Sequence, residues 1–147
     1  MFIKRLIRAL LLDPAVYEEI EHDKRALWQA ALVVLLSSLS RGLYAYNVGN
    51  YAGLVIGTIT NFVLWVLLSF LIYIIGTKLF PESETRSDHW EVMRVLGFAS
   101  APGIFRAFAS TPHMTAIVFL VVWVWTLAAM IVACPATAQP TPRQALE

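Results

Sequence analysis

The pattern of hydrophobic and polar positions is dominated by long runs without charge. The longest run, residues 42–77, contains no Asp, Glu, Lys, Arg or His. A helix rises about 1.5 Å per residue and the hydrocarbon core of a bilayer is about 30 Å thick, so this run is longer than one crossing needs. We expect a membrane-spanning helix over residues 52–77, which ends before the polar sequence that contains Lys78 and Pro81.

Two further runs have the length and composition of membrane helices. Residues 26–46 carry few strongly polar side chains, namely Gln29, three serines and Arg41. Residues 114–133 contain no charged side chain and match the thickness of one bilayer. The pattern therefore predicts three spans, over about residues 26–46, 52–77 and 114–133.

The segment over residues 88–110 is less regular. Asp88 and Glu91 have the spacing of a capping box and predict a helix start, but Pro102 and Gly103 interrupt the helix that follows. Non-helical backbone at membrane depth requires protein or water to satisfy it, so we expect a kinked, re-entrant or interfacial helix here. Broken helices line binding sites in transporters, and the break is either such a site or a structural kink. The candidate polar residues on this segment are Arg94 and Arg106.

Small residues suggest how the second span packs. Gly49, Gly53 and Gly57 recur at every fourth position, which places them on one helix face and allows another backbone to approach closely. The spacing fits a contact inside the bundle or a dimer contact, and we favour the internal one. Asn61 lies further along the same helix, and because an amide in lipid needs a partner, we expect it to face another helix.

The first 25 residues combine apolar and charged positions. Residues 2–12 predict an amphipathic helix with Lys4, Arg5 and Arg8 on its polar face. Such a helix lies in the headgroup plane with its cations toward anionic lipid, or packs on the cytoplasmic side of the protein itself. Asp13 and Pro14 predict the start of a second helix, as N-cap and first helical residue.

Composition supports an all-α integral membrane protein embedded in a lipid bilayer. Hydrophobic residues make up 59% of the 147-residue chain and charged residues 14%, and the mean hydropathy is +0.67. The net charge of +1 argues against a nucleic-acid partner. The three histidines stand apart from one another, so we predict no catalytic residues, no metal site and no cofactor. We divide the chain into a cytoplasmic helical region (1–25), a membrane domain (26–133) and an extended, poorly ordered tail (134–147).

Basic residues indicate the orientation. Five of them precede the first span and two lie in the loop after the second, whereas the loop between those spans has only Arg41 at its edge. The positive-inside rule therefore places the N-terminus in the cytoplasm. The tail is cytoplasmic if residues 88–110 cross the membrane, and external if they only dip into it.

Three stretches resemble the Yip family of polytopic membrane proteins in its short prokaryotic form. They are DPAVYEEIEHDKRALWQA before the first span, IGTKLFPESETR at the end of the second, and RVLGFASAPGIF. The most specific part is Gly97, Phe98 and Pro102, preceded by residues 76–80. The resemblance implies a helical membrane bundle of several spans, in the plasma (inner) membrane of a prokaryote. Eukaryotic members are linked to membrane traffic and bind prenylated Rab-type GTPases, a partner that we do not transfer to prokaryotic ones.

The C-terminal sequence departs from the family pattern. In similar proteins an Arg-Gln-Ala-Leu-acidic run closely follows the last apolar stretch seen here, and a further span comes next. Here that run, residues 143–147, appears only after CPATAQPTP. We therefore expect a shortened member of the family.

Two functions fit these observations. The first is a non-enzymatic scaffold or adaptor in membrane organisation or trafficking-like processes, with a membrane-protein partner or a second copy of itself. The second is a small transporter or channel-like protein that uses the break at Pro102 and Gly103. Its candidate residues are Asn61, Arg94, Gly97, Pro102, Gly103 and Arg106.

Overall fold

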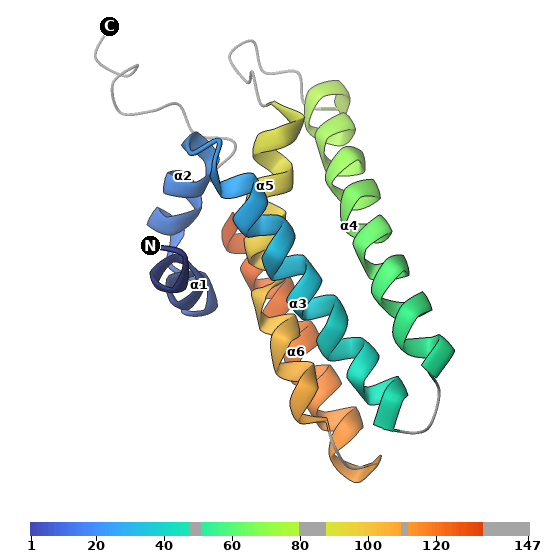
Figure 1. Ribbon diagram of the computed structural model, residues 1–147. Coiled ribbons are helices and arrows are strands. Elements are labelled where there is room, and N and C mark those ends of the chain that lie inside the picture. The colour runs from blue at the N-terminus through green and yellow to red at the C-terminus, as the bar shows by residue number, and fades with distance from the viewer. Residues whose placement is uncertain (48–50, 80–87, 110–111, 134–147) are drawn as a thin grey trace, which may run out of the picture.

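The protein is built from helices throughout the part of the chain that the structure describes. The computed structural model describes residues 1–47, 51–79, 88–109 and 112–133. These contain six α-helices and one 3-10 helix, η1, so the predicted all-α class is confirmed (Figure 1). In chain order they are α1 (Phe2–Leu10), α2 (Pro14–His22), α3 (Ala26–Asn47), α4 (Tyr51–Leu79), α5 (His89–Ala99), η1 (Ala101–Phe108) and α6 (Pro112–Ala133).

Three of the described helices are long and apolar enough to cross a membrane. Their apolar segments are Ala26–Leu43 in α3, Tyr51–Gly76 in α4 and Met114–Ala133 in α6, close to the predicted spans. Inside the protein, 44% of the most apolar part of α3 is buried, against 11% for α4 and 17% for α6. α3 is therefore the central helix, and α4 and α6 present most of their apolar surface to lipid.

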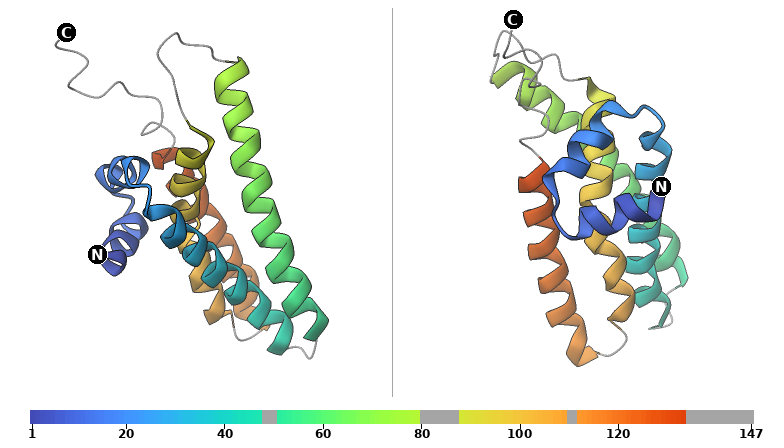
Figure 2. Two further views of the ribbon diagram at one scale, coloured as in Figure 1. Left: turned by 45° about the horizontal axis from the view of Figure 1, so that its top comes forward. Right: turned by 90° about the vertical axis from the view of Figure 1, so that its left-hand side faces the viewer.

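The α5–η1 segment runs from one end of the bundle to the other. At its start, the ring of His89 lies 5.6 Å from that of Phe70, in the C-terminal half of α4. At its other end, the Arg106 guanidinium lies 5.9 Å from the ring of Phe119, in the N-terminal part of α6. Figures 1 and 2 show the segment running beside α3 and in the same direction. Of the predicted alternatives, the helix is kinked and passes through the bundle, so α6 returns to the end at which α2 lies.

The kink has a local cause in the chain. Pro102 lacks an N–H and disrupts the α-helical ladder, so the chain continues as a 3-10 helix. Ser100 supports the junction, because its hydroxyl donates to the Gly97 carbonyl and its own carbonyl accepts from the Gly103 N–H at 2.9 Å. The backbone groups at the break are thus partly satisfied by the chain itself, as burial among helices requires.

Small residues bring α5–η1 against α3. A Cβ added at Gly97 would lie 2.6 Å from the Cβ of Ala30. About two turns further along both segments, a Cβ added at Gly103 would overlap the hydroxyl of Ser37. At these two contacts the small residues allow the backbones of α5–η1 and α3 to pack closely against each other at the centre of the bundle.

The two short N-terminal helices fold onto the bundle. Asp13 caps α2 by accepting from the Ala15 N–H at 3.0 Å. A left-handed turn at Leu12 (φ 59°) reverses the chain, so that α1 and α2 lie side by side against α5, η1 and α6 (Figure 2). Tyr17 is fully buried between them and donates to the Ala9 carbonyl. One face of α1 therefore packs on the protein, as in the second of the two predicted arrangements, while Ile3 and Ile7 on another face are exposed.

Candidate functional site

Polar side chains meet at the centre of the membrane domain. The Asn61 side-chain N–H on α4 donates to the Ser38 hydroxyl on α3 at 2.8 Å, and this hydroxyl donates to the Val34 carbonyl at 2.6 Å. The bond joins two spans that are adjacent in sequence and is worth about 0.6 kcal/mol in a typical membrane protein. The structure therefore gives Asn61 a partner on another helix.

A cavity of about 310 Å³ lies next to this hydrogen bond. Its polar lining comes from Ser37, Asn61, Ser100, Arg106 and Thr126, and its remaining walls are apolar. The structure thus brings together Asn61 and Arg106, which are 45 positions apart, at one space inside the bundle. A cavity of this size suits a small ligand or an acyl chain segment.

The helix break itself is filled by protein. Pro102 is among the fully buried side chains, and Gly103 lies directly against Ser37. Gly97 likewise contacts Ala30, so three of the candidate residues at the break serve packing. The geometry leaves room for a ligand beside the break, at Ser100 and Arg106, but not at Pro102.

Arg94 lies away from this cavity, at the contact between α5 and α2. Its side chain is 5% exposed and donates from Nη2 to the Glu21 carbonyl. Burial, and after it the negative charge of Glu91, raises the pKa of Glu21 to about 7, while the nearby positive charges of Arg94 and His22 oppose that shift. Arg94 thus anchors α2 to the membrane domain, and the carboxyl beside it titrates near neutral pH.

Two of the three predicted membrane-surface cations are used inside the protein. Arg5 is 8% exposed and pairs with Glu19 at 2.8 Å and with Asp23 at 2.7 Å. Arg8 pairs with Asp13 at 2.7 Å. A headgroup role is therefore wrong for Arg5, because the turn at Leu12 folds α1 back onto the carboxylates of α2.

These ion pairs change the acidity of their partners. The hydrogen bond from Arg5 lowers the pKa of Asp23, and the hydrogen bond from Arg8 lowers the pKa of Asp13. Lys4 is exposed, and its contact with anionic lipid stays a prediction. The carboxylates of Asp13, Glu19 and Asp23 and the guanidinium groups of Arg5 and Arg8 together form an ion-pair network that fixes α1 against α2.

Gly57, one of the predicted packing glycines of α4, does not make a close contact inside the bundle. A Cβ at Gly57 would meet nothing within 4 Å, so an internal close contact is wrong at this position. Gly49 lies outside the described residues, and Gly53 lies on α4. The close approach uses Gly42 on α3, where a Cβ would lie 2.6 Å from a Leu54 methyl group and 3.0 Å from its carbonyl oxygen.

The sequence contains a weak signal for that contact. Ser38 and Gly42 are four residues apart and form a small-x-x-x-small pair on α3. The same helix carries Ala30 and Ser37, which receive Gly97 and Gly103. The small-residue face that organises the bundle is therefore on α3, and a dimer role for the α4 glycines stays a prediction.

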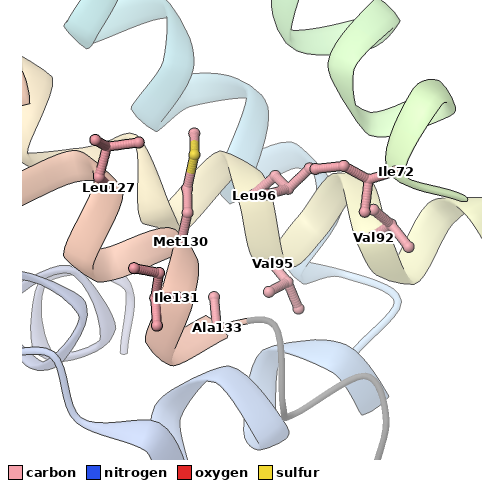
Figure 3. Close-up of a pocket in the computed structure, with 8 residues that line it drawn as sticks. All are labelled: Ile72, Val92, Val95, Leu96, Leu127, Met130, Ile131 and Ala133. Atoms are coloured by element: carbon pink, nitrogen blue, oxygen red, sulfur yellow. The ribbon is translucent and has the colours of Figure 1, made fainter. Parts of the chain in front are cut away.

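Two further cavities adjoin the polar one. An apolar cavity of about 250 Å³ lies between α4, α5 and α6 and is lined by Ile72, Val95 and Met130, among others (Figure 3). A cavity of about 470 Å³ at the other end of α6 is lined by Arg41, Arg106 and three residues of α6. Within the described ranges, no group of three or more His, Cys, Asp or Glu side chains is placed to hold a metal ion.

Comparison with known proteins identifies one family. The model of the Yip1 domain family matches residues 8–146, almost the whole chain. Comparison with curated proteins gave no match, and neither did comparison with solved structures. The match covers all the helices described above except the first residues of α1.

Proposed function

The chain belongs to the Yip1 domain family of integral membrane proteins, and from this premise we propose that it is a non-enzymatic scaffold or adaptor. In this role it holds a partner protein at the membrane through the surface of α1 and α2. We place that surface in the cytoplasm, following the basic residues of the N-terminal region, and the protein in the plasma membrane of a prokaryote.

The observation that carries the proposal is the rigid attachment of α1 and α2 to the membrane bundle. Arg5 joins α1 to α2 through Glu19 and Asp23 and donates to the Gln29 side chain of α3 at 3.2 Å. The Trp125 indole N–H on α6 donates to the Leu10 carbonyl at 3.0 Å. Arg94 adds a third link, from α5 to α2. The platform that α1 and α2 form is held in this way and presents a fixed surface to a partner. A preordered surface binds with a smaller entropic cost than a flexible one.

A photo-crosslinking experiment in the native membrane tests the proposal. A photoreactive phenylalanine analogue replaces Glu18, which is exposed on α2, or Ile59, which is 59% exposed on the lipid-facing side of α4. We expect Glu18 to give a discrete protein adduct and Ile59 to give lipid adducts. Arg5→Gln should weaken the Glu18 adduct by loosening the attachment of α1 and α2, while Lys78→Gln, at an exposed cation on α4 outside that surface, should leave the adduct unchanged. Lipid adducts alone at Glu18 would contradict the proposal.

The alternative function, a small transporter or channel-like protein, is supported by the cavity that Ser37, Asn61, Ser100 and Arg106 line within the bundle. In this case Arg106 would attract an anion, because it lines the cavity as its one cation. Flux of small anions into liposomes that contain the protein, abolished by Arg106→Ala and retained in Lys78→Ala, would favour this function. Absence of flux above empty liposomes would exclude it for the anions tested.

A further inference from the structure

Two arginines share a cavity near the end of the bundle that lies opposite α2. Arg41 on α3 and Arg106 on η1 line this space of about 470 Å³ together with Phe119, Leu120 and Trp123 of α6. The two positive charges repel one another, and in the described part of the chain no carboxylate pairs with either of them. An anion between the two guanidinium groups would offset their repulsion.

The pair lies within side-chain reach of the phosphate level of a bilayer. At about 1.5 Å per residue, Arg41 lies about 9 Å from the Asn47 end of α3. Arg106 lies in the last turn of η1, at the same end of the bundle. α3 spans a hydrocarbon core of about 30 Å with a little length to spare, so both guanidinium groups can reach the boundary between hydrocarbon and headgroups.

A groove with largely apolar walls leads away from the arginines along α6, and several polar side chains line its middle part. The arginine cavity and the central cavity share Arg106 and Trp123. The central cavity and the apolar cavity of Figure 3 share Leu96, Leu127 and Met130. The three spaces are therefore adjacent and extend from Phe119 to Ala133, about 21 Å along the helix axis.

The elements beside the groove leave it open to the bilayer. α4 packs on α3 and α5, whereas α6 packs mainly on η1 and α5. The α4 and α6 side chains that flank the groove include Leu64 and Trp123, which are 51% and 59% exposed. A lipid chain can enter such a groove sideways from the membrane.

We propose that this surface binds one anionic phospholipid, with its phosphate between Arg41 and Arg106 and an acyl chain in the groove along α6. This site is distinct from the predicted headgroup contact of α1, which is at the other end of the bundle. A lipid supplies in one molecule the negative charge that the arginines lack and the apolar chain that the groove accepts.

Neither a free phosphate ion nor a second copy of the chain fits both the arginine pair and the groove. Inorganic phosphate would neutralise the arginines but leave the groove empty. A helix from a second copy would fill the groove, but residues 42–77 and 114–133 contain no carboxylate that could pair with the arginines. The contiguity of charge and groove therefore favours lipid.

Native mass spectrometry of the full chain, released from mild detergent, tests the site. The probes are phosphatidylglycerol, phosphatidylcholine of the same chain length, and inorganic phosphate. We expect phosphatidylglycerol to occupy one site with at least tenfold tighter binding than phosphatidylcholine. Arg41→Gln with Arg106→Gln should remove this preference, and Lys78→Gln, which removes a cation at the other end of the bundle, should keep it.

A second variant tests the groove and guards against misfolding. Met130→Trp narrows the groove and leaves both arginines in place, so it should reduce retention of both phospholipids about equally. All variants are compared by far-ultraviolet circular dichroism and by elution volume; if the double variant is misfolded, Arg41→Gln alone, at an exposed residue, must lower the preference at least threefold. An unchanged lipid preference in a folded arginine variant, full displacement by phosphate, or dimers in place of lipid adducts would overturn the proposal.

Discussion

Gly97→Ala inserts one methyl group at the closest contact between α5 and α3. The new Cβ would lie 2.6 Å from the Ala30 Cβ, 3.1 Å from its Cα and 3.2 Å from its carbonyl carbon. Ordinary contacts between carbon atoms are about 3.5–4.0 Å, so the helices must separate by about 1 Å at this point. Overpacking of this kind costs about 1–3 kcal/mol, and the helix propensity of alanine returns about 1 kcal/mol. We expect Gly97→Ala to lower the free energy of unfolding by up to about 2 kcal/mol.

Gly57→Ala is the matched control, because nothing lies within 4 Å of its added Cβ. Only the propensity gain applies, so this variant should be as stable as the wild type or more stable by up to about 1 kcal/mol. Unfolding is followed by circular dichroism as the fraction of a denaturing detergent is raised. Ala30→Gly removes the atom that the new methyl group meets, and should restore part of the loss when combined with Gly97→Ala. Equal stability of the two alanine variants would refute this description of the α3–α5 contact.

Three further variants test other contacts by the same unfolding measurement. Glu21→Gln should flatten the pH dependence: the folded-state pKa of about 7 lies above the reference value of 4.5, so wild-type stability is full below about pH 4.5 and falls as pH rises to about 7. Between these pH values the free energy of unfolding of the wild type falls by about 1–2 kcal/mol, after allowance for the partial exposure of Glu21. Glu18→Gln, at an exposed carboxylate, should leave this pH dependence unchanged. Arg5→Gln should cost about 1–3 kcal/mol, since it leaves the partly buried Asp23 without its ion-pair partner, whereas Glu19 keeps its pair with Arg8; an unchanged midpoint would show that the Arg5 ion pairs add nothing. Asn61→Leu should cost about 0.6 kcal/mol, and an equal effect in a Ser38→Ala background would show that their hydrogen bond is not the cause.

The long helices follow from the sequence because length and apolarity alone determine them. Residues 52–77 and 114–133 could hardly be anything other than spans, and the structure places helices over both. The helix start at Asp88 and the kink at Pro102 also have local signals, a capping box and a missing N–H. In each case the determining interactions lie within a few residues of one another.

The contacts between helices could not be predicted, since they depend on which faces meet. The contacts that Gly42 and Gly97 make become evident only when their neighbours, Leu54 and Ala30, are known. The burial of Arg5 depends on a turn at Leu12. Leu12 has a positive φ although it is not a glycine, so its residue type does not indicate the turn. The shared cavity of Arg41 and Arg106 arises because α3 and α5–η1 run in the same direction, which neither sequence segment encodes by itself.

The most direct test of the architecture is the membrane sidedness of the two ends of the bundle. Single cysteines replace Glu18 on α2 and Phe108 at the end of η1, both exposed, in a Cys134→Ser background. A membrane-impermeant maleimide is then applied to intact cells and to inverted vesicles. We predict labelling of Cys at position 108 from outside intact cells and of Cys at position 18 only in inverted vesicles. Labelling of both from the same side would mean that residues 88–109 do not cross the membrane, and would contradict the fold and the two sites derived from it.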